Sequence, residues 1–223
     1  MNSLLIYGIL ILLWFLYVLQ KKLRQRKIIK THLQDAVKEA KEILRTHPLF
    51  LDTETTGIGD NDEIIEISII DKNERILIDT LIKPKKKIPK ESTNIHNITN
   101  SDVKNSPTFF EIINRLNSIL NNRVVCVYNA DFDCRLLRQS AIKWRENISL
   151  PNKTRFFCIM KLFAKYSGEW DNYHNHFKWH KLEDALKICG IHMRGNSHRA
   201  LFDTIGAKRI LFHIADHYVK KNR

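Results

Sequence analysis

The hydrophobic pattern begins with an apolar run at the N-terminus. Residues 4–19 are uncharged and almost wholly apolar, and six basic residues follow within positions 21–30. A helix over residues 4–19 would be about 24 Å long, against a hydrocarbon core of roughly 30 Å, a mismatch that snorkelling flanks and thin bilayers accommodate. The run has no positive charge before it and no small-residue cleavage site after it, so a cleavable signal peptide is not indicated. The pattern predicts a transmembrane or signal-anchor helix over residues 1–20. It also predicts a single-pass, membrane-anchored protein whose remainder is cytoplasmic.

Residues 21–46 form a basic juxtamembrane segment that leads into an amphipathic pattern. Apolar residues recur among charges at offsets of three and four, which is typical of a helix with one buried face. Pro48 ends the pattern. We expect a linker helix that acts as a stalk or packs on the following domain, which we place at residues 47–220. The apolar positions are Leu33, Ala36, Val37, Ala40, Ile43 and Leu44.

From residue 49 onward, short strand patterns alternate with helical ones. Three strands are expected first, and a continuous apolar run at residues 124–127 suits a strand buried on both faces. Helices are expected after Pro107, after Asn129 and from near Ser197, whereas residues 92–105 and 166–179 lack periodicity and are expected to be polar loops. The succession predicts an α/β domain. The other predicted strands cover residues 49–54, 64–70, 76–81 and 156–158, and the shorter helices residues 160–163 and 182–188.

Two acids stand at the end of the first predicted strand. Asp52 and Glu54 are two positions apart, so both side chains project to one face. Two carboxylates in one small volume raise each other's pKa unless a cation lies between them. The pair therefore indicates either a proton-sharing acid pair or a divalent metal site. A surface strand with two solvated acids is the alternative.

Further acids occur at element ends later in the chain. Asp133 follows the buried strand at residues 124–127, where it is either a functional acid or a first-turn acid favoured by the helix dipole. Asp203 lies on an otherwise apolar stripe of the last helix, and a buried carboxylate there requires a cation. His198 precedes Asp203 by five positions, which on one helix would turn it about 140° away. We therefore expect His198 in the preceding loop or at the helix start.

Charge and cysteine content add to this pattern. The 223-residue chain has a formal net charge of +13, concentrated in residues 21–30 and in a second lysine cluster at residues 83–90. The first cluster suits membrane phosphates, and the second either meets nucleic acid or forms a solvated loop. The four cysteines lack framework spacing, which favours free thiols in a reducing compartment. A zinc site recruiting Cys158 or Cys189 with nearby histidines is an alternative, although their spacing matches no common zinc module.

The order of these acids resembles the DEDDh 3′-to-5′ exonucleases, the DnaQ-like group of the ribonuclease H-like fold. Residues 52–55 (DTET) match the first motif of that family, residues 129–133 (NADFD) the second, and residues 198–203 (HRALFD) the third. Residues 95–99 are similar to its substrate loop, and residues 157–162 to its cT(m)xL segment. The resemblance implies a mixed five-stranded sheet flanked by helices.

Two departures from the family pattern concern substrate contacts rather than metal ligands. Tyr128 replaces the histidine that often opens the second motif, and Asn97 replaces the glycine of the substrate loop. A sister class carries a tyrosine four positions before the last aspartate, where this chain has Arg199. The resemblance therefore indicates the histidine class.

The resemblance implies phosphodiester hydrolysis with two Mg²⁺ or Mn²⁺ ions. Asp52, Glu54, Asp133 and Asp203 would hold the ions, and His198 would accept the proton of the attacking water. The candidates for substrate binding are Thr55, Thr56, His96 and Asn129, although His96 also fits a capped loop without a substrate role.

We expect a membrane-tethered exonuclease that removes nucleotides from the 3′ end of single-stranded or frayed nucleic acid, with DNA favoured over RNA. One alternative is a tethered adaptor that binds nucleic-acid ends without cutting them. Another is an exoribonuclease acting on short RNA. Protein partners and oligomeric state are not indicated by the sequence.

Overall fold

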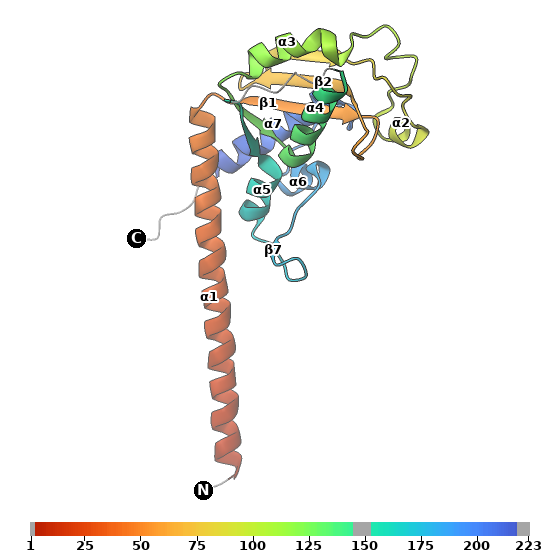
Figure 1. The fold of residues 1–223 in the computed structure, drawn as a ribbon. Helices are drawn as coiled ribbons and strands as arrows, with labels where there is room; N and C mark the ends of the chain where they lie inside the picture. Colours follow the sequence, from red (N-terminus) through yellow and green to blue (C-terminus); the bar gives the residue numbers. More distant parts are fainter. Residues whose placement is uncertain (1–2, 145–152, 218–223) are drawn as a thin grey trace.

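A mixed five-stranded sheet forms the centre of the computed structural model, which describes residues 3–144 and 153–217 (Figure 1). The strand order is β3-β2-β1-β4-β5, with β1–β2 and β2–β3 antiparallel and β1–β4 and β4–β5 parallel. This arrangement confirms the predicted α/β fold and its mixed sheet. The strands are β1 (Leu49–Thr55), β2 (Ile64–Asp71), β3 (Ile76–Leu81), β4 (Val124–Val127) and β5 (Arg155–Cys158).

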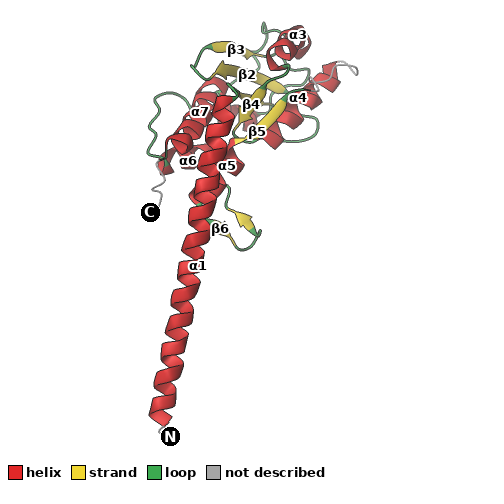
Figure 2. Cartoon of the chain, turned by 90° about the vertical axis from the view of Figure 1, so that its left-hand side faces the viewer, coloured by secondary structure: helices red, strands yellow, loops and turns green. Residues whose placement is uncertain are grey.

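Helices cover both faces of the sheet and create two separate apolar clusters (Figures 1 and 2). Helices α3 (Phe109–Leu120) and α4 (Ala130–Trp144) pack on the face that carries Leu49 and Leu51. Helices α5 (Ile159–Ser167), α6 (Leu182–Ile188) and α7 (Ala200–Asp216) pack on the face that carries Phe50. Because side chains alternate along β1, Asp52 and Glu54 share the Phe50 face, where α7 lies.

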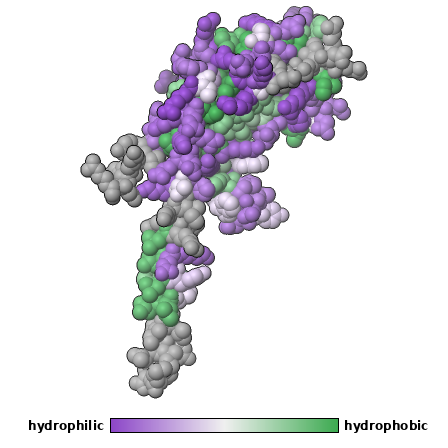
Figure 3. All heavy atoms as spheres, turned by 60° about the vertical axis from the view of Figure 1, so that its left-hand side comes forward, coloured by the Kyte–Doolittle hydropathy of each residue, from purple (hydrophilic) through white to green (hydrophobic). Residues whose placement is uncertain are grey.

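The N-terminal segment is one continuous helix, α1 (Ser3–Arg45), which projects far beyond the domain (Figure 1). Its C-terminal part packs on α5 and α7, burying Ala36, Val37 and Ala40, as expected for a linker helix that packs on the domain. Apolar side chains gather on the projecting part (Figure 3). The exposed ones include Leu12, Leu13, Trp14, Phe15, Tyr17 and Leu23.

The prediction of a membrane anchor at residues 1–20 is wrong by this structure. Within the described residues, no helix combines the length and the apolar character that crossing a membrane requires. The apolar run at residues 4–19 spans about 24 Å as a helix, short of a hydrocarbon core of roughly 30 Å, and basic residues follow it from position 21. The single-pass topology, the cytoplasmic placement and the membrane partner inferred from this helix are withdrawn with it.

Two segments that lack periodicity are more regular than expected. Residues Lys90–His96 form helix α2, which ends at Asn97 with a positive φ of 59°. Within the predicted loop at 166–179, β6 (Trp170–Asp171) and β7 (His176–Phe177) pair as a small antiparallel hairpin. Two-residue strands cannot display a two-residue period, so their sequence carries no strand signal. The predicted domain limit at residue 220 lies outside the described residues.

Candidate active site

The four predicted acids come from three different elements and line one cleft of about 560 Å³. Asp52 and Glu54 come from β1, Asp133 from the first turn of α4, and Asp203 from the first turn of α7. Side chains from three separate parts of the chain therefore converge, as the sequence predicted. The remaining lining residues are Thr53, Tyr128, Asn129, Phe132, Met160, Trp179, His180, Lys181, Leu182, Glu183 and His198.

Asp133 is the most enclosed of these acids, with 3% of its surface exposed. The hydroxyl group of Thr53 donates a hydrogen bond of 2.8 Å to Asp133 Oδ1. Since Thr53 stands between Asp52 and Glu54 on β1, this bond ties the start of α4 to the strand that carries the other two acids. Asp133 does lie in the first turn of α4, as the helix-dipole alternative required, and its side chain is buried in the cleft with the other acids.

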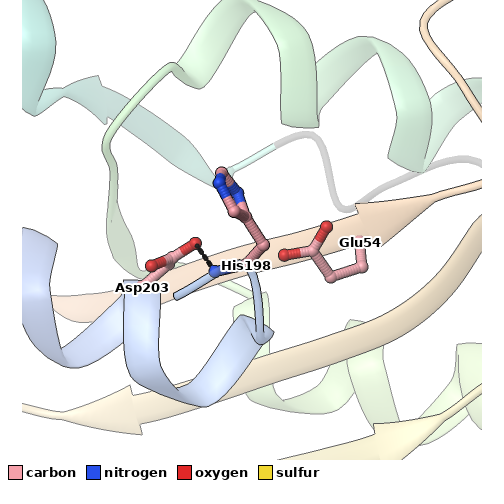
Figure 4. Close-up of side chains that lie close together, drawn as sticks. All are labelled: Glu54, His198 and Asp203. Atoms are coloured by element: carbon pink, nitrogen blue, oxygen red, sulfur yellow. Dashed lines mark hydrogen bonds between the residues drawn. The ribbon is translucent and has the colours of Figure 1, made fainter. Parts of the chain in front are cut away.

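His198 lies in the segment just before α7, as its offset from Asp203 required. Its backbone has a positive φ of 59°, and its N–H donates a 3.2 Å hydrogen bond to Asp203 Oδ2 (Figure 4). One ligand atom each from Glu54, His198 and Asp203 lie within 4.8 Å of one another. The His198 ring also faces α6, where its Nε2 lies 3.3 Å from Glu183 Oε1. Glu183 was not predicted from the sequence.

A second unpredicted residue, Glu66, fixes the position of the segment that carries His198. Glu66 lies opposite Glu54 across the β1–β2 pair and is 4% exposed. Its carboxylate accepts hydrogen bonds from Arg199 Nε at 3.1 Å and from the N–H of Ala200 at 2.9 Å. A charged acceptor at the first turn also complements the helix dipole of α7. The entry into α7 is thus attached to the same sheet as the acids.

Burial raises the pKa values of all four acids, and repulsion from other carboxylates adds to the rise for Asp52, Glu54 and Asp203. The pKa of Asp52 lies well above its ordinary value because of burial, followed by repulsion from Asp133, Asp203, Glu54 and Glu66. Burial, with added repulsion from Asp203, raises the pKa of Glu54 to about 8. Burial raises the pKa of Asp133 to about 7, against the hydrogen bond from Thr53. It raises the pKa of Asp203 to about 6, although the charge of His198 opposes it.

These donors fit divalent cations with a preference for oxygen ligands. Mg²⁺ and Mn²⁺ are bound through carboxylates and water, and positive charge between carboxylates removes the repulsion that raises their pKa values. The alternative zinc site receives no support from the geometry. In the described ranges, Glu54, His198 and Asp203 form the only group of three or more potential ligands, and Cys158 donates instead to the backbone oxygen of Tyr128.

The four candidates for substrate binding occupy different positions. Asn129 lines the cleft. The hydroxyl group of Thr55 donates to the Gly57 oxygen at 2.7 Å, and that of Thr56 donates to Asp62 at 2.8 Å. His96 is buried, and its Nδ1 accepts a hydrogen bond from the N–H of Ile98, as in a capped loop. Roles of these residues in substrate binding stay predictions.

The second lysine cluster is partly engaged in holding loops together. Lys86 pairs with Asp62, and the side chain of Lys85 donates to the backbone oxygen of Lys143. The backbone N–H groups of Lys85 and Lys86 both donate to the buried carboxylate of Glu63. These contacts give the cluster a structural role, and Lys83, Lys87 and Lys90 remain exposed.

The mixed sheet and the four converging acids define a nuclease domain of the ribonuclease H-like type. The chain belongs to the exonuclease family RNase_T, whose family model matches residues 49–211. It is 41% identical over 167 residues to the "Uncharacterized exonuclease CP81" of Escherichia phage 186, covering 74% of this chain and 86% of that protein. It is also 33% identical over 162 residues to a "DNA polymerase III subunit epsilon-like protein" of Rhodobacter capsulatus, covering 69% of this chain but 21% of that one.

Solved structures share the fold. One is "Exonuclease X in complex with 5′ overhanging duplex DNA", with a TM-score of 0.55, 24% identity, and coverage of 74% of this chain and 89% of that one. Another is the nuclease domain of 3′hExo, described as "a DEDDh family member, bound to rAMP". Its TM-score is 0.59 at 17% identity, covering 76% of this chain and 92% of that one. The protein is therefore an exonuclease by family, and it shares its fold with these structures.

Proposed function

We propose that this exonuclease removes nucleotides from the 3′ end of single-stranded or frayed DNA with two divalent metal ions. The observation that carries the proposal is the convergence of Asp52, Glu54, Asp133 and Asp203 with His198 in one cleft. Binding of nucleic-acid ends without cleavage would not need this costly group of acids. The adaptor alternative also depended on the predicted membrane anchor, which is wrong.

Asp52, Glu54 and Asp203 would hold one Mg²⁺ or Mn²⁺ ion, and Asp52 with Asp133 the other. When bound, the ions supply charge for the phosphate and for the leaving 3′ oxygen and acidify water. The His198 imidazole takes the proton of the attacking water on the ring nitrogen that does not face Glu183. Glu183 lies against the opposite nitrogen, His198 Nε2, and the hydrogen bond from the His198 backbone to Asp203 holds the ring beside the acids.

The cleft can accept ribose as well as deoxyribose, because discrimination against a 2′-hydroxyl depends on contacts that a strand makes only when bound. A short-RNA exoribonuclease is therefore the second candidate. It is favoured by one specific observation, the structural neighbour described as bound to rAMP. Rates on DNA and RNA oligomers of matched sequence and length separate the two functions.

The test is digestion of a 5′-labelled single-stranded oligonucleotide with Mg²⁺ or with EDTA. We expect stepwise shortening from the 3′ end with Mg²⁺ alone, and resistance when the 3′-terminal linkages are phosphorothioates. Immediate release of the 5′ label as a mononucleotide would refute the polarity.

A matched pair of variants on α4 tests the site. Asp133→Asn should remove cleavage, whereas Asp131→Asn should retain it. Asp131 is an exposed acid of the same helix turn that pairs with Lys161 at 2.6 Å. Full activity of Asp133→Asn, or of Asp52→Asn, would refute the assignment of the acids.

A further inference from the structure

The hairpin formed by β6 and β7 carries a row of stacked rings beside the cleft. The rings of His174 and His176 stack with centroids 5.5 Å apart and planes inclined by 20°. The rings of His176 and Trp179 stack at 4.8 Å and 17°. Three flat rings therefore lie stacked over six residues of chain. Tyr173, at the start of the row, meets His174 edge-on.

The row ends at the site already described, because Trp179 lines the same cleft as the acids. Trp179 is followed along the chain by His180, Lys181 and Leu182, which line the cleft too. Apolar groups of Phe132 and Met160 complete this part of the lining. The cleft thus combines carboxylates, suited to a phosphate with its metal ions, with flat and apolar surface suited to a nucleobase.

Packing of the core does not explain Trp179. Its side chain is 51% exposed, and it belongs to none of the apolar clusters that fill the described domain. Large exposed aromatic surface next to a cleft is typical of a binding site. The His176 ring stacks on one face of the Trp179 indole ring. The indole ring is therefore a flat platform supported from one face.

The two strands of the hairpin that precedes Trp179 are held to each other and to α1. The Phe177 ring meets Trp170 edge-on at 5.2 Å and His32 of α1 at 4.9 Å. Lys178 donates to the Glu169 carboxylate at 2.7 Å, and its N–H donates to the Glu169 backbone oxygen at 2.8 Å. Figures 1 and 2 show the hairpin standing out from the domain alongside α1. A platform held in this way loses little conformational entropy when a base stacks on it.

We infer that Trp179, backed by His176 and His174, is a stacking platform for a base of the single strand whose 3′ end enters the cleft. This inference rests on the proposed function, since it takes the ligand to be a single-stranded nucleic acid. Every base has a π-face, so the platform accepts any sequence. A base paired in a duplex is already stacked between its neighbours, so the platform selects unpaired strands.

The test measures binding apart from cleavage. A single-stranded oligothymidylate is titrated onto the full chain in EDTA, with tryptophan fluorescence and fluorescence anisotropy of the labelled oligonucleotide as readouts. Trp179→Leu, which keeps apolar bulk without a flat face, should weaken binding roughly 5- to 150-fold, the range expected for one stacked base. Trp179→Phe, which keeps a flat ring, should recover most of the affinity. Quenching by the oligonucleotide should be lost in both variants.

Tyr173→Leu is the matched control, because Tyr173 is a 90% exposed aromatic residue of the same hairpin that does not line the cleft. Binding weakened by Trp179→Leu and retained by Tyr173→Leu and Trp179→Phe supports the inference. Equal affinity of Trp179→Leu and the unchanged chain overturns it, as does equal loss in Trp179→Leu and Tyr173→Leu. A chain that binds with quenching in EDTA but never cleaves with Mg²⁺ refutes the proposed function while leaving the platform in place.

Discussion

Raising the pH in the absence of divalent cations should destabilise the folded domain. The folded protein favours the protonated forms of its clustered acids, because burial raises the pKa of Asp133 to about 7 and that of Glu54 to about 8. A group whose pKa is raised on folding stabilises the fold most below its unfolded pKa. That contribution is lost as the pH rises through the folded pKa, here between about pH 4 and 8.

Asp133 sets the magnitude because it is nearly fully buried. Its pKa rises from 3.8 to about 7, and each unit corresponds to about 1.4 kcal/mol, so the whole effect is about 4 kcal/mol. Between about pH 5.5 and 9 the loss is about 2 kcal/mol, since roughly 1.5 units of the rise lie in that interval. For a domain of this size that lowers the midpoint of thermal unfolding by about 4–8 °C. Glu54 and Asp203 act in the same direction.

The assay is thermal unfolding at about pH 5.5 and about pH 9, in EDTA and in Mg²⁺, an interval that covers the upper part of the titration. We expect the midpoint in EDTA to fall with rising pH, and Mg²⁺ to raise it far more at the higher pH. Asp133→Asn, whose amide oxygen can still accept from Thr53, should show a smaller fall. Equal midpoints at both pH values in EDTA, or an equal effect of Mg²⁺ at both, would refute the reasoning.

Three further predictions follow from packing and charge. Asp203→Asn should remove metal-dependent cleavage yet raise the metal-free unfolding midpoint at pH above about 7, because Asp203 adds to the repulsion on Asp52 and Glu54; a lower midpoint would contradict this. Glu66→Ala should cost about 2–4 kcal/mol by calorimetry and reduce activity, because Arg199 and the α7 entry lose their acceptor. Glu74→Ala, which removes the ion pair between the 39% exposed Glu74 side chain and Lys208, should cost under about 1 kcal/mol, and equal costs would count against the Glu66 role. A chain beginning at residue 29 should unfold at the same temperature as the full chain, whereas one beginning at residue 47 should unfold earlier, since it lacks Ala36 and Ala40.

The sequence could predict those parts of the site that depend on a regular period. Alternation along β1 placed Asp52 and Glu54 on one face, and the apolar stripe of the last helix placed Asp203 toward the sheet. The five-residue offset of His198 required a non-helical position, and the structure has a left-handed backbone there. These are local rules, in which the geometry of a single element determines the direction of a side chain.

Residues whose roles depend on distant partners could not be found in this way. Glu66 lies in a strand of buried apolar residues, and its meaning comes from Arg199, 133 positions later. Glu183 resembles an ordinary first-turn acid of a short helix until α6 is placed against His198. The apolar run at residues 4–19 misled because its hydropathy suits a membrane span, whereas its sixteen positions are too few to cross a typical hydrocarbon core.

The continuity of α1 makes the helix a rigid spacer. Because the helix has no break, a partner bound to its projecting part would fix both the distance and the orientation of the cleft. The same helix touches the hairpin through His32 and Phe177, only two residues before Trp179. A displacement of α1 would therefore act on the segment that carries Trp179, at the edge of the cleft.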